Sequence, residues 1–192
     1  MKRKRVNILI IIGLLFITAA LSLTGYNVLS DMKASVRAAD CLQRLEFGAE
    51  AFDWEQTPEM EMPAAEAGGV PFVGALEVPD LGLRLPVAAY WSEEFAKTVP
   101  CRYTGSPYTG DLIVAGHNYR RHFGMLGRLQ PGSEVYFTDL AGNTFFYIVY
   151  SIEAVDGSDI ERMKAGSEGW DLTLFTCNFS GRARLAVRCV EE

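Results

Sequence analysis

Residues 171–177 read Asp-Leu-Thr-Leu-Phe-Thr-Cys, and residues 184–188, Arg-Leu-Ala-Val-Arg, follow closely. The first stretch is a short apolar run rich in strand-forming residues, and apolar residues alternate along the second. Turn-forming residues lie between them at positions 178–181, Asn-Phe-Ser-Gly. The pattern predicts two neighbouring strands, with Cys177 where the first one ends and Arg184 on the second.

Cys177 is a candidate nucleophile because of this position. A thiolate reacts best when it is exposed and when a nearby positive charge lowers its pKa, and a strand end beside Arg184 offers both conditions. Taken alone, a single cysteine is more often a small core residue. Nucleophilic catalysis also needs a partner that carries a proton, and the chain contains only two histidines, His117 and His122.

His117 is the better placed of the two histidines. It follows residues 111–116, Asp-Leu-Ile-Val-Ala-Gly, a buried-strand pattern that ends in glycine. We therefore expect His117 at another strand end, where a rigid scaffold commonly presents catalytic side chains. His122 follows Arg120 and Arg121, and we interpret it as a solvated histidine of a surface turn.

Three motifs together resemble those of the sortases, which are cysteine transpeptidases on the surface of Gram-positive bacteria. They are residues 173–177 (Thr-Leu-Phe-Thr-Cys), residues 184–188 and residues 115–118 (Ala-Gly-His-Asn). The resemblance covers roughly residues 70–190, about the size of one ordinary domain. The pentapeptide is specific, whereas Gly-His or a single arginine is a weak signal. All three in this order, at strand ends, form a strong one.

The resemblance implies a role for each motif residue. Cys177 would attack a peptide carbonyl and form a thioester, as in the EC 3.4.22 class. His117, as a cation, would stabilise the thiolate and then protonate the departing amine. Arg184 would donate hydrogen bonds to the substrate and the oxyanion. Thr176 and Asn118 are expected to border the substrate, although Thr176 could equally be a packing residue at the strand end. Arg182 shares strand parity with Arg184, and we choose Arg184 because Arg-Leu-x-Val matches the family pattern.

The expected substrate is a Leu-Pro-x-Thr-Gly-like sorting signal of a secreted protein, and the expected acceptor is an amine of peptidoglycan. The alternatives are a pilin lysine, as in pilin-polymerising sortases, a cysteine peptidase that transfers the acyl group to water, and a non-catalytic surface module. The interval between Cys177 and Arg184 is shorter than is usual in the family. Asn118 resembles class B sortases and residues 123–132 resemble classes A and D, so the subclass stays open.

The N-terminal residues predict a membrane anchor. Residues 2–5, Lys-Arg-Lys-Arg, precede residues 6–25, which carry no charge. Twenty residues of helix span about 30 Å, the thickness of a bilayer core. The basic cluster favours a cytoplasmic N-terminus, which would place the rest of this single-pass chain outside the cell, facing the cell wall. The alternative is a cleaved signal peptide with small residues at positions 18–20. We assign residues 1–26 to the basic tail and anchor.

Residues 27–69 are expected to form an extracellular helix and an acidic linker. Apolar residues recur at helical spacing over residues 28–47, namely Leu29, Met32, Val36, Ala39, Leu42 and Leu45. Residues 53–69 are acidic and rich in proline and glycine, which is typical of a linker. Asp53-Trp54 resembles the Asp-Pro-aromatic lid of pilin-polymerising sortases, but the proline is missing and an ordinary linker is the better interpretation.

Residues 70–192 are predicted to form a mainly β catalytic domain with short helices. Strand-like runs lie at 73–78, 83–88, 111–115, 133–139, 145–152, 172–176 and 184–188, with hairpin-turn residues at 139–143. Many short strands and few helices predict a closed antiparallel barrel. The resemblance implies about eight strands.

Charge and composition exclude other classes of protein. The net charge is −6, and it becomes −10 without the four basic residues at positions 2–5. An acidic domain disfavours nucleic acid as a partner, and it also disfavours adhesion to anionic lipid. No metal or cofactor is expected. Some class A sortases bind calcium, and acidic residues could serve as its ligands here, but they are more simply surface charges: Glu134, Asp156, Asp159 and Glu161.

Of the four cysteines, Cys101 and Cys189 could form a disulfide, or Cys189 could remain a buried thiol.

Overall fold

The computed structural model describes residues 2–48, 62–157, 159, 169–177 and 183–192. The elements in chain order are α1 (Lys2–Arg44), β1 (Ala65–Ala67), β2 (Val70–Val78), the 3₁₀ helix η2 (Pro79–Leu81), β3 (Leu83–Ala88), α2 (Glu93–Ala96), β4 (Cys101–Thr104), η3 (Pro107–Thr109), β5 (Leu112–Gly116), η4 (Phe123–Arg128), β6 (Glu134–Asp139), β7 (Thr144–Asp156), β8 (Leu172–Cys177) and β9 (Ala183–Glu191). Asp53 and Trp54, which resembled a lid, lie outside the described residues.

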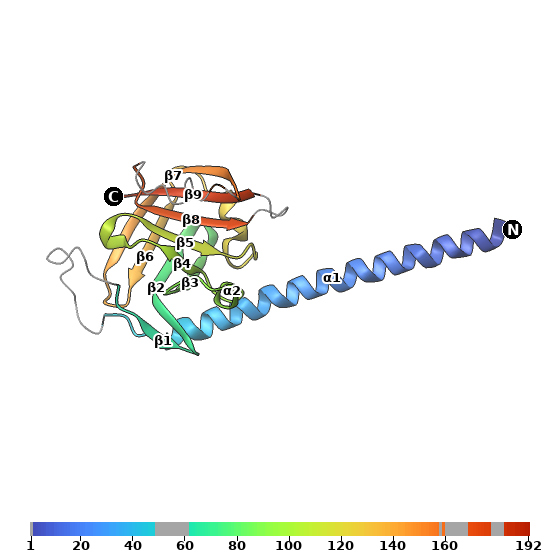
Figure 1. The fold of residues 1–192 in the computed structure, drawn as a ribbon, viewed down its shortest axis with the longest axis horizontal. Helices are drawn as coiled ribbons and strands as arrows, with labels where there is room; N and C mark the ends of the chain where they lie inside the picture. Colours follow the sequence, from blue (N-terminus) through green and yellow to red (C-terminus); the bar gives the residue numbers. More distant parts are fainter. Residues whose placement is uncertain (1, 49–61, 158, 160–168, 178–182) are drawn as a thin grey trace.

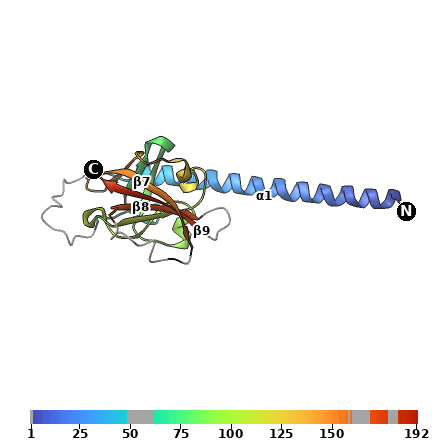
Figure 2. The ribbon, with the colours of Figure 1, turned by 90° about the horizontal axis from the view of Figure 1, so that it is seen from above.

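α1 is one continuous helix that joins the predicted anchor to the helix predicted over residues 28–47. It projects away from the rest of the chain, so the N-terminus lies far from the barrel (Figures 1 and 2). Its part from Ile8 to Arg44 contains a window that is long and apolar enough to cross a membrane, and this window is not buried within the protein.

Only part of the apolar stripe expected over residues 28–47 packs on the barrel. Leu29, Met32 and Val36 are exposed, at 57%, 46% and 66% respectively. The buried residues are mostly small and recur at helical spacing: Ala34, Ala38, Cys41 and Leu45. Small side chains allow a helix to approach a sheet closely. The large apolar residues instead continue the exposed apolar surface of the anchor.

Eight strands, β2 to β9, close into a barrel in the order β2-β3-β4-β5-β8-β9-β7-β6, with β6 pairing back onto β2. β1 pairs with β2 and extends the sheet into the segment predicted as a linker. The predicted fold class is confirmed. Most pairs are antiparallel, but β3–β4 and β5–β8 run parallel. The β5–β8 pair matters for function, because parallel neighbours bring their C-terminal ends to the same edge of a sheet.

One hydrophobic core fills the barrel and continues under α1. Apolar side chains from all eight barrel strands or their flanking turns line it, and Ala38, Cys41 and Leu45 of α1 join the same cluster. The predicted turn at residues 139–143 is confirmed as the β6–β7 hairpin. There the Asn143 backbone N–H donates to the Asp139 carboxylate at 2.9 Å. Through Ala38, Cys41 and Leu45, the C-terminal end of α1 is part of the folded unit, whereas its N-terminal part projects away from the barrel.

Candidate active site

Strand register brings the three predicted catalytic positions together. In the parallel β5–β8 pair, Gly116 lies opposite Thr176, so His117 is the next residue beyond this pair. In the antiparallel β8–β9 pair, Cys177 lies directly opposite Arg184. The three neighbouring strands β5, β8 and β9 thus meet with these positions at one rim of the barrel. Arg182, the alternative to Arg184, lies outside the described residues.

Gly116 is required by the packing of the loop that follows β5. A Cβ atom at this position would lie only 2.6 Å from the Cδ2 atom of Phe123, whose ring is fully buried. The Phe123 backbone N–H donates to the His117 carbonyl at 3.2 Å, and the Gly124 N–H donates to the Tyr119 carbonyl at 2.8 Å. The chain therefore turns back on itself directly after His117, and this turn fixes the position of the histidine backbone.

The His117 ring is half-buried and stacks on Tyr119, with ring centroids 4.9 Å apart. Burial first, and then the positive charge of Lys97, lower the pKa of His117 below its ordinary value. An isolated imidazolium is therefore disfavoured in this environment. The cationic form becomes favourable when a negative charge, such as a thiolate, lies beside it.

His122 was predicted to be solvated, and this prediction was wrong, because its side chain has 0% exposure. Burial lowers its pKa to about 4. Among the described residues neither ring nitrogen has a hydrogen-bond partner, and the ring lies against Tyr119 with centroids 5.8 Å apart. The exposed Arg120 and Arg121 suggested a surface turn, but the turn folds back so that the next residue is covered.

The two predicted substrate-binding residues occupy different surroundings. Thr176 is buried and follows the inward-facing Leu172 and Leu174, which belong to the core. Its hydroxyl has no hydrogen-bond partner among the described residues. Asn118 is half-buried, and its Oδ1 atom would lie 3.0 Å from a Cβ atom placed on Gly124. Their roles toward a substrate stay predictions.

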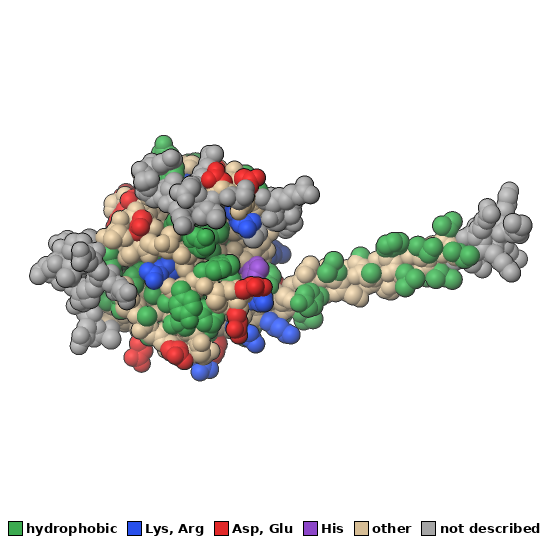
Figure 3. All heavy atoms as spheres, viewed as in Figure 1, with side chains coloured by type: hydrophobic (Ala, Val, Ile, Leu, Met, Phe, Trp, Pro, Cys, Tyr) green, Lys and Arg blue, Asp and Glu red, His purple; other side chains and the backbone are tan. Residues whose placement is uncertain are grey.

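An aromatic cluster beside the site was not predicted. Phe175 packs edge-on against Tyr103 of β4 with centroids 5.4 Å apart, and Tyr103 packs edge-on against Trp91 at 6.5 Å. Trp91 is 47% exposed. Figure 3 shows hydrophobic side chains gathered on one face of the barrel, with a histidine at its edge. The sequence offered no signal for this cluster, because its members come from three separate segments.

The other cysteines are buried, and Cys41, Cys101 and Cys189 are free thiols, so the disulfide alternative does not hold. Burial raises the pKa of Cys101 to about 11 and that of Cys189 to about 12, which makes them poor nucleophiles. Within the described ranges no group of three or more histidine, cysteine, aspartate or glutamate residues is arranged to hold a metal ion. Glu161, one of the calcium candidates, lies outside these ranges.

These features define a closed β-barrel with a histidine, a cysteine and an arginine at neighbouring strand ends. The sequence model of the sortase domain matches residues 76–192, more than half of the chain. The chain therefore belongs to the sortase family, a family of cysteine transpeptidases.

Solved structures share the same fold. Group B Streptococcus pilus island 1 sortase C2 is 20% identical with a TM-score of 0.58, and the match covers 85% of this chain and 97% of that one. Sortase C1 from Streptococcus suis is 25% identical with a TM-score of 0.54, covering 63% and 73%. Sortase A from Corynebacterium diphtheriae is 17% identical with a TM-score of 0.57, covering 86% and 84%. No curated protein matches the chain in sequence.

Proposed function

We propose that this protein is a membrane-anchored transpeptidase that cleaves a Leu-Pro-x-Thr-Gly-like sorting signal through a thioester on Cys177. The observation that carries the proposal is the strand register, in which Cys177 lies opposite Arg184 and His117 follows the residue opposite Thr176. His117 lies 60 residues before Cys177, yet it joins Cys177 and Arg184 at adjacent strand ends. The three residues have the chemistry of a proton carrier, a nucleophile and an oxyanion donor.

The reaction has two steps. The Cys177 thiolate adds to the carbonyl carbon of the scissile peptide bond, and the resulting oxyanion collapses as the C–N bond breaks. The leaving amine takes its proton from the His117 imidazolium, which leaves a thioester and a neutral imidazole. In the second step an acceptor amine attacks the thioester carbonyl, His117 takes the proton, and the Cys177 thiolate departs.

The lowered pKa of His117 suits this cycle. Burial and Lys97 disfavour the imidazolium unless the thiolate accompanies it. Once the thiolate is consumed in forming the thioester, the imidazolium loses its stabilising charge and gives up its proton more readily to the amine. Arg184 would donate hydrogen bonds to the developing oxyanion, and loss of one such donor typically lowers the rate by about 10²–10³-fold.

Residues near the candidate site would bind the peptide substrate, and α1 would hold the protein in the membrane. The cluster of Trp91, Tyr103 and Phe175 offers apolar contact for an extended peptide whose scissile bond reaches Cys177. α1 would anchor the chain in the cell membrane with the basic residues 2–5 in the cytoplasm and the barrel outside, facing the cell wall. No cofactor is required by this chemistry.

The acceptor is an amine of peptidoglycan or, alternatively, a pilin lysine. Likeness in fold to a pilus-island sortase C2 is the observation that keeps the second acceptor in view. A cysteine peptidase that uses water in the second step is a further alternative. These three alternatives differ only in the nucleophile that attacks the thioester: a peptidoglycan amine, a pilin lysine or water.

The experiment incubates the full chain in detergent with a panel of Leu-Pro-x-Thr-Gly-like peptides, with and without an oligoglycine amine or a lysine-bearing pilin peptide. We expect amide products with an amine and their loss in Cys177→Ala. The matched control, Cys41→Ala, removes a buried thiol elsewhere and should keep activity. Products that stay purely hydrolytic with every amine would favour the peptidase, and unchanged activity in Cys177→Ala would refute the mechanism.

A further inference from the structure

The polar end of the anchor is defined by the sequence of α1. Residues 6–30 carry no charge, and Asp31 is the first charged residue after Arg5. Tyr26 directly follows the apolar segment of residues 6–25, a position where aromatic residues commonly mark the membrane–water interface. The outer surface of a bilayer that holds α1 therefore lies between Tyr26 and Asp31.

The loop that follows His117 touches this same part of α1. The Arg121 backbone N–H donates to the Asp31 carboxylate at 3.1 Å, a contact between residues 90 positions apart. The pKa of Tyr119 is raised by burial and then by the nearby Tyr26 and Asp31. The loop of residues 118–121 thus lies beside the segment of α1 where the anchor ends.

The barrel is oriented with its candidate site on the side of the membrane anchor. Figure 1 shows the C-terminal ends of β5 and β8, which carry the candidate site, on the side of the barrel from which the anchor projects. The opposite end of the barrel lies near Glu191, which pairs with Tyr147. Seven residues separate Arg184 from Glu191 along β9, so the two ends are about 23 Å apart.

The distance of residues 118–121 from the hydrocarbon core of the bilayer follows from helix geometry. Asp31 lies six residues beyond Gly25, which is about 9 Å along the helix axis. The headgroup layer on each side of the hydrocarbon core is about 5–7 Å thick. A loop held between Tyr26 and Asp31 therefore stands at the level of the headgroups or just above them.

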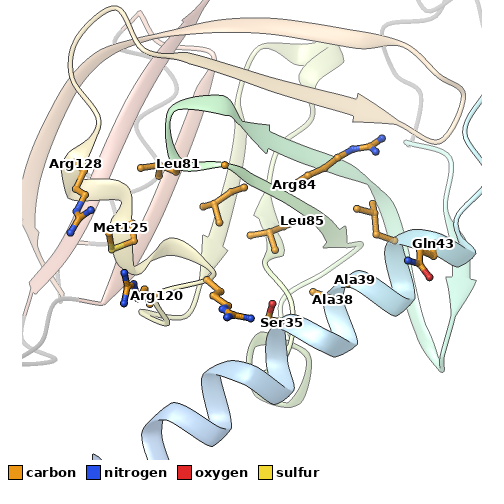
Figure 4. Close-up of a pocket in the computed structure, with 14 residues that line it drawn as sticks. Ser35, Ala38, Ala39, Gln43, Leu81, Arg84, Leu85, Arg120, Met125 and Arg128 are labelled. Atoms are coloured by element: carbon orange, nitrogen blue, oxygen red, sulfur yellow. The ribbon is translucent and has the colours of Figure 1, made fainter.

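Although the chain outside residues 2–5 carries a net charge of −10, the loop at this level presents two arginines that fit phosphate groups. Arg120 and Arg121 are exposed. With Arg84 and Arg128 they line a groove of about 610 Å³ between α1 and the barrel (Figure 4), and its lining contains no acidic residue. Arg84 also pairs with Glu77 at 3.6 Å. Lys97 of α2 pairs with Glu93 at 3.8 Å. Asp31 itself is engaged with the loop.

We propose that residues 118–121 dock on the headgroup layer of an anionic phospholipid bilayer, with Arg120 and Arg121 against lipid phosphates and Asp31 holding the loop to α1. This proposal rests on the membrane anchoring given under the proposed function. Its consequence is that His117 and Cys177 work at the membrane surface and not at the end of a stalk.

The test uses the full chain in nanodiscs of phosphatidylcholine and phosphatidylglycerol at 3:1, with a trace lipid that carries a photoactivatable group on its headgroup. After illumination, mass spectrometry compares labelling of residues 118–121 with labelling of residues 140–147 at the opposite end. We expect at least tenfold more label on residues 118–121. Equal labelling of the two segments would overturn the proposal.

Three variants sharpen this test. Seven helical residues inserted after Gly25 move the barrel about 10 Å further from the membrane. They leave the rotation of the barrel about the helix axis nearly unchanged, because seven residues make almost two turns. This insertion should reduce the label about tenfold. Arg120→Glu with Arg121→Glu, or discs of phosphatidylcholine alone, should reduce it severalfold. Asp31→Ala should also reduce it, whereas the matched control Asp40→Ala, which loses only a pair with Arg44, should not. If labelling of residues 118–121 is unchanged by the insertion, or unchanged by the charge-reversing substitutions, the docking is contradicted.

Labelling requires no turnover, so its outcome is separate from that of the proposed function. If no peptide is processed but residues 118–121 are labelled, the docking stands and the transpeptidase proposal fails. If peptides are processed through Cys177 but the label does not favour residues 118–121, the docking alone is wrong. A second readout compares a peptide tethered to a lipid by a short linker with the same peptide free in solution. The insertion should slow only the tethered reaction, by about tenfold, because the tether then cannot span the gap.

Discussion

Replacing Gly116 by alanine tests how the loop that carries His117 is held. The added methyl group would lie 2.6 Å from Cδ2 and 2.7 Å from Cγ of Phe123, and these ring atoms are its nearest neighbours. Ordinary carbon–carbon contacts lie at about 3.5–4.0 Å, so the ring and the strand must separate by about 1 Å. Phe123 is fully buried, so a shift of its ring must displace other core atoms.

The cost can be estimated from this overlap. Overpacking of a dense core typically costs about 1–3 kcal/mol, which corresponds to a fall in Tm of roughly 2–12 °C for a chain of this size. A displacement of about 1 Å at a catalytic group can lower the rate about 10²-fold, and His117 is the next residue. We expect Gly116→Ala to reduce both the free energy of unfolding and the rate of sorting-peptide cleavage.

Thermal unfolding and peptide cleavage by the full chain in detergent measure both effects. Gly127→Ala is the matched control, because its Cβ would meet only Leu185 at 3.4 Å. Phe123→Ala in the Gly116→Ala background supplies the decisive comparison. If the clash is the cause, the two penalties are not additive, and the alanine at 116 becomes nearly neutral once the ring is gone. Additive penalties, or a Gly116→Ala protein that matches the control, would refute the reasoning.

Three further predictions follow from buried groups. Because burial lowers the pKa of His122 to about 4 from an unfolded value near 6.5, the unfolded state binds more protons between these values; stability should therefore fall as the pH drops from about 6.5 towards 4, and His122→Phe should flatten this slope in denaturant titrations. Lys97→Gln should raise the pKa of His117 in an NMR titration, since Lys97 lowers it, and no change would exclude that charge as a cause. Glu153→Ala should cost about 2–4 kcal/mol of unfolding free energy, because it removes a carboxylate 3.0 Å from the fully buried Arg188; a loss below 0.5 kcal/mol would contradict this role for the pair.

The parts of the fold that could be predicted from sequence are those with local signals. The alternation in residues 184–188 and the apolar run in residues 172–176 identified β9 and β8, and the turn residues at 139–143 identified the hairpin. β4 is only four residues long, from Cys101 to Thr104, and follows a proline, so it had no periodic pattern to read. β1, with three residues, offered even less.

The features that were missed depend on contacts between distant segments. His122 is buried because the turn after β5 folds back on itself, which no pattern around two arginines could reveal. The apolar spacing over residues 28–47 did not reveal which face of α1 packs, because residues beside a membrane segment are apolar on several faces, and hydrophobicity did not distinguish Leu29 from Ala34. The parallel β5–β8 pair, which brings His117 beside the end of β8, is likewise a property of topology.

The central claim is that Cys177 is the nucleophile of a transpeptidation at the rim formed by β5, β8 and β9. The most direct measurement is mass spectrometry of the full chain, quenched with acid during turnover of a sorting peptide and mapped by proteolysis. We expect an acyl thioester on Cys177 that accumulates without an amine and disappears into an amide product when one is added. Product formation with no adduct on Cys177, or with an adduct on another residue, would contradict it.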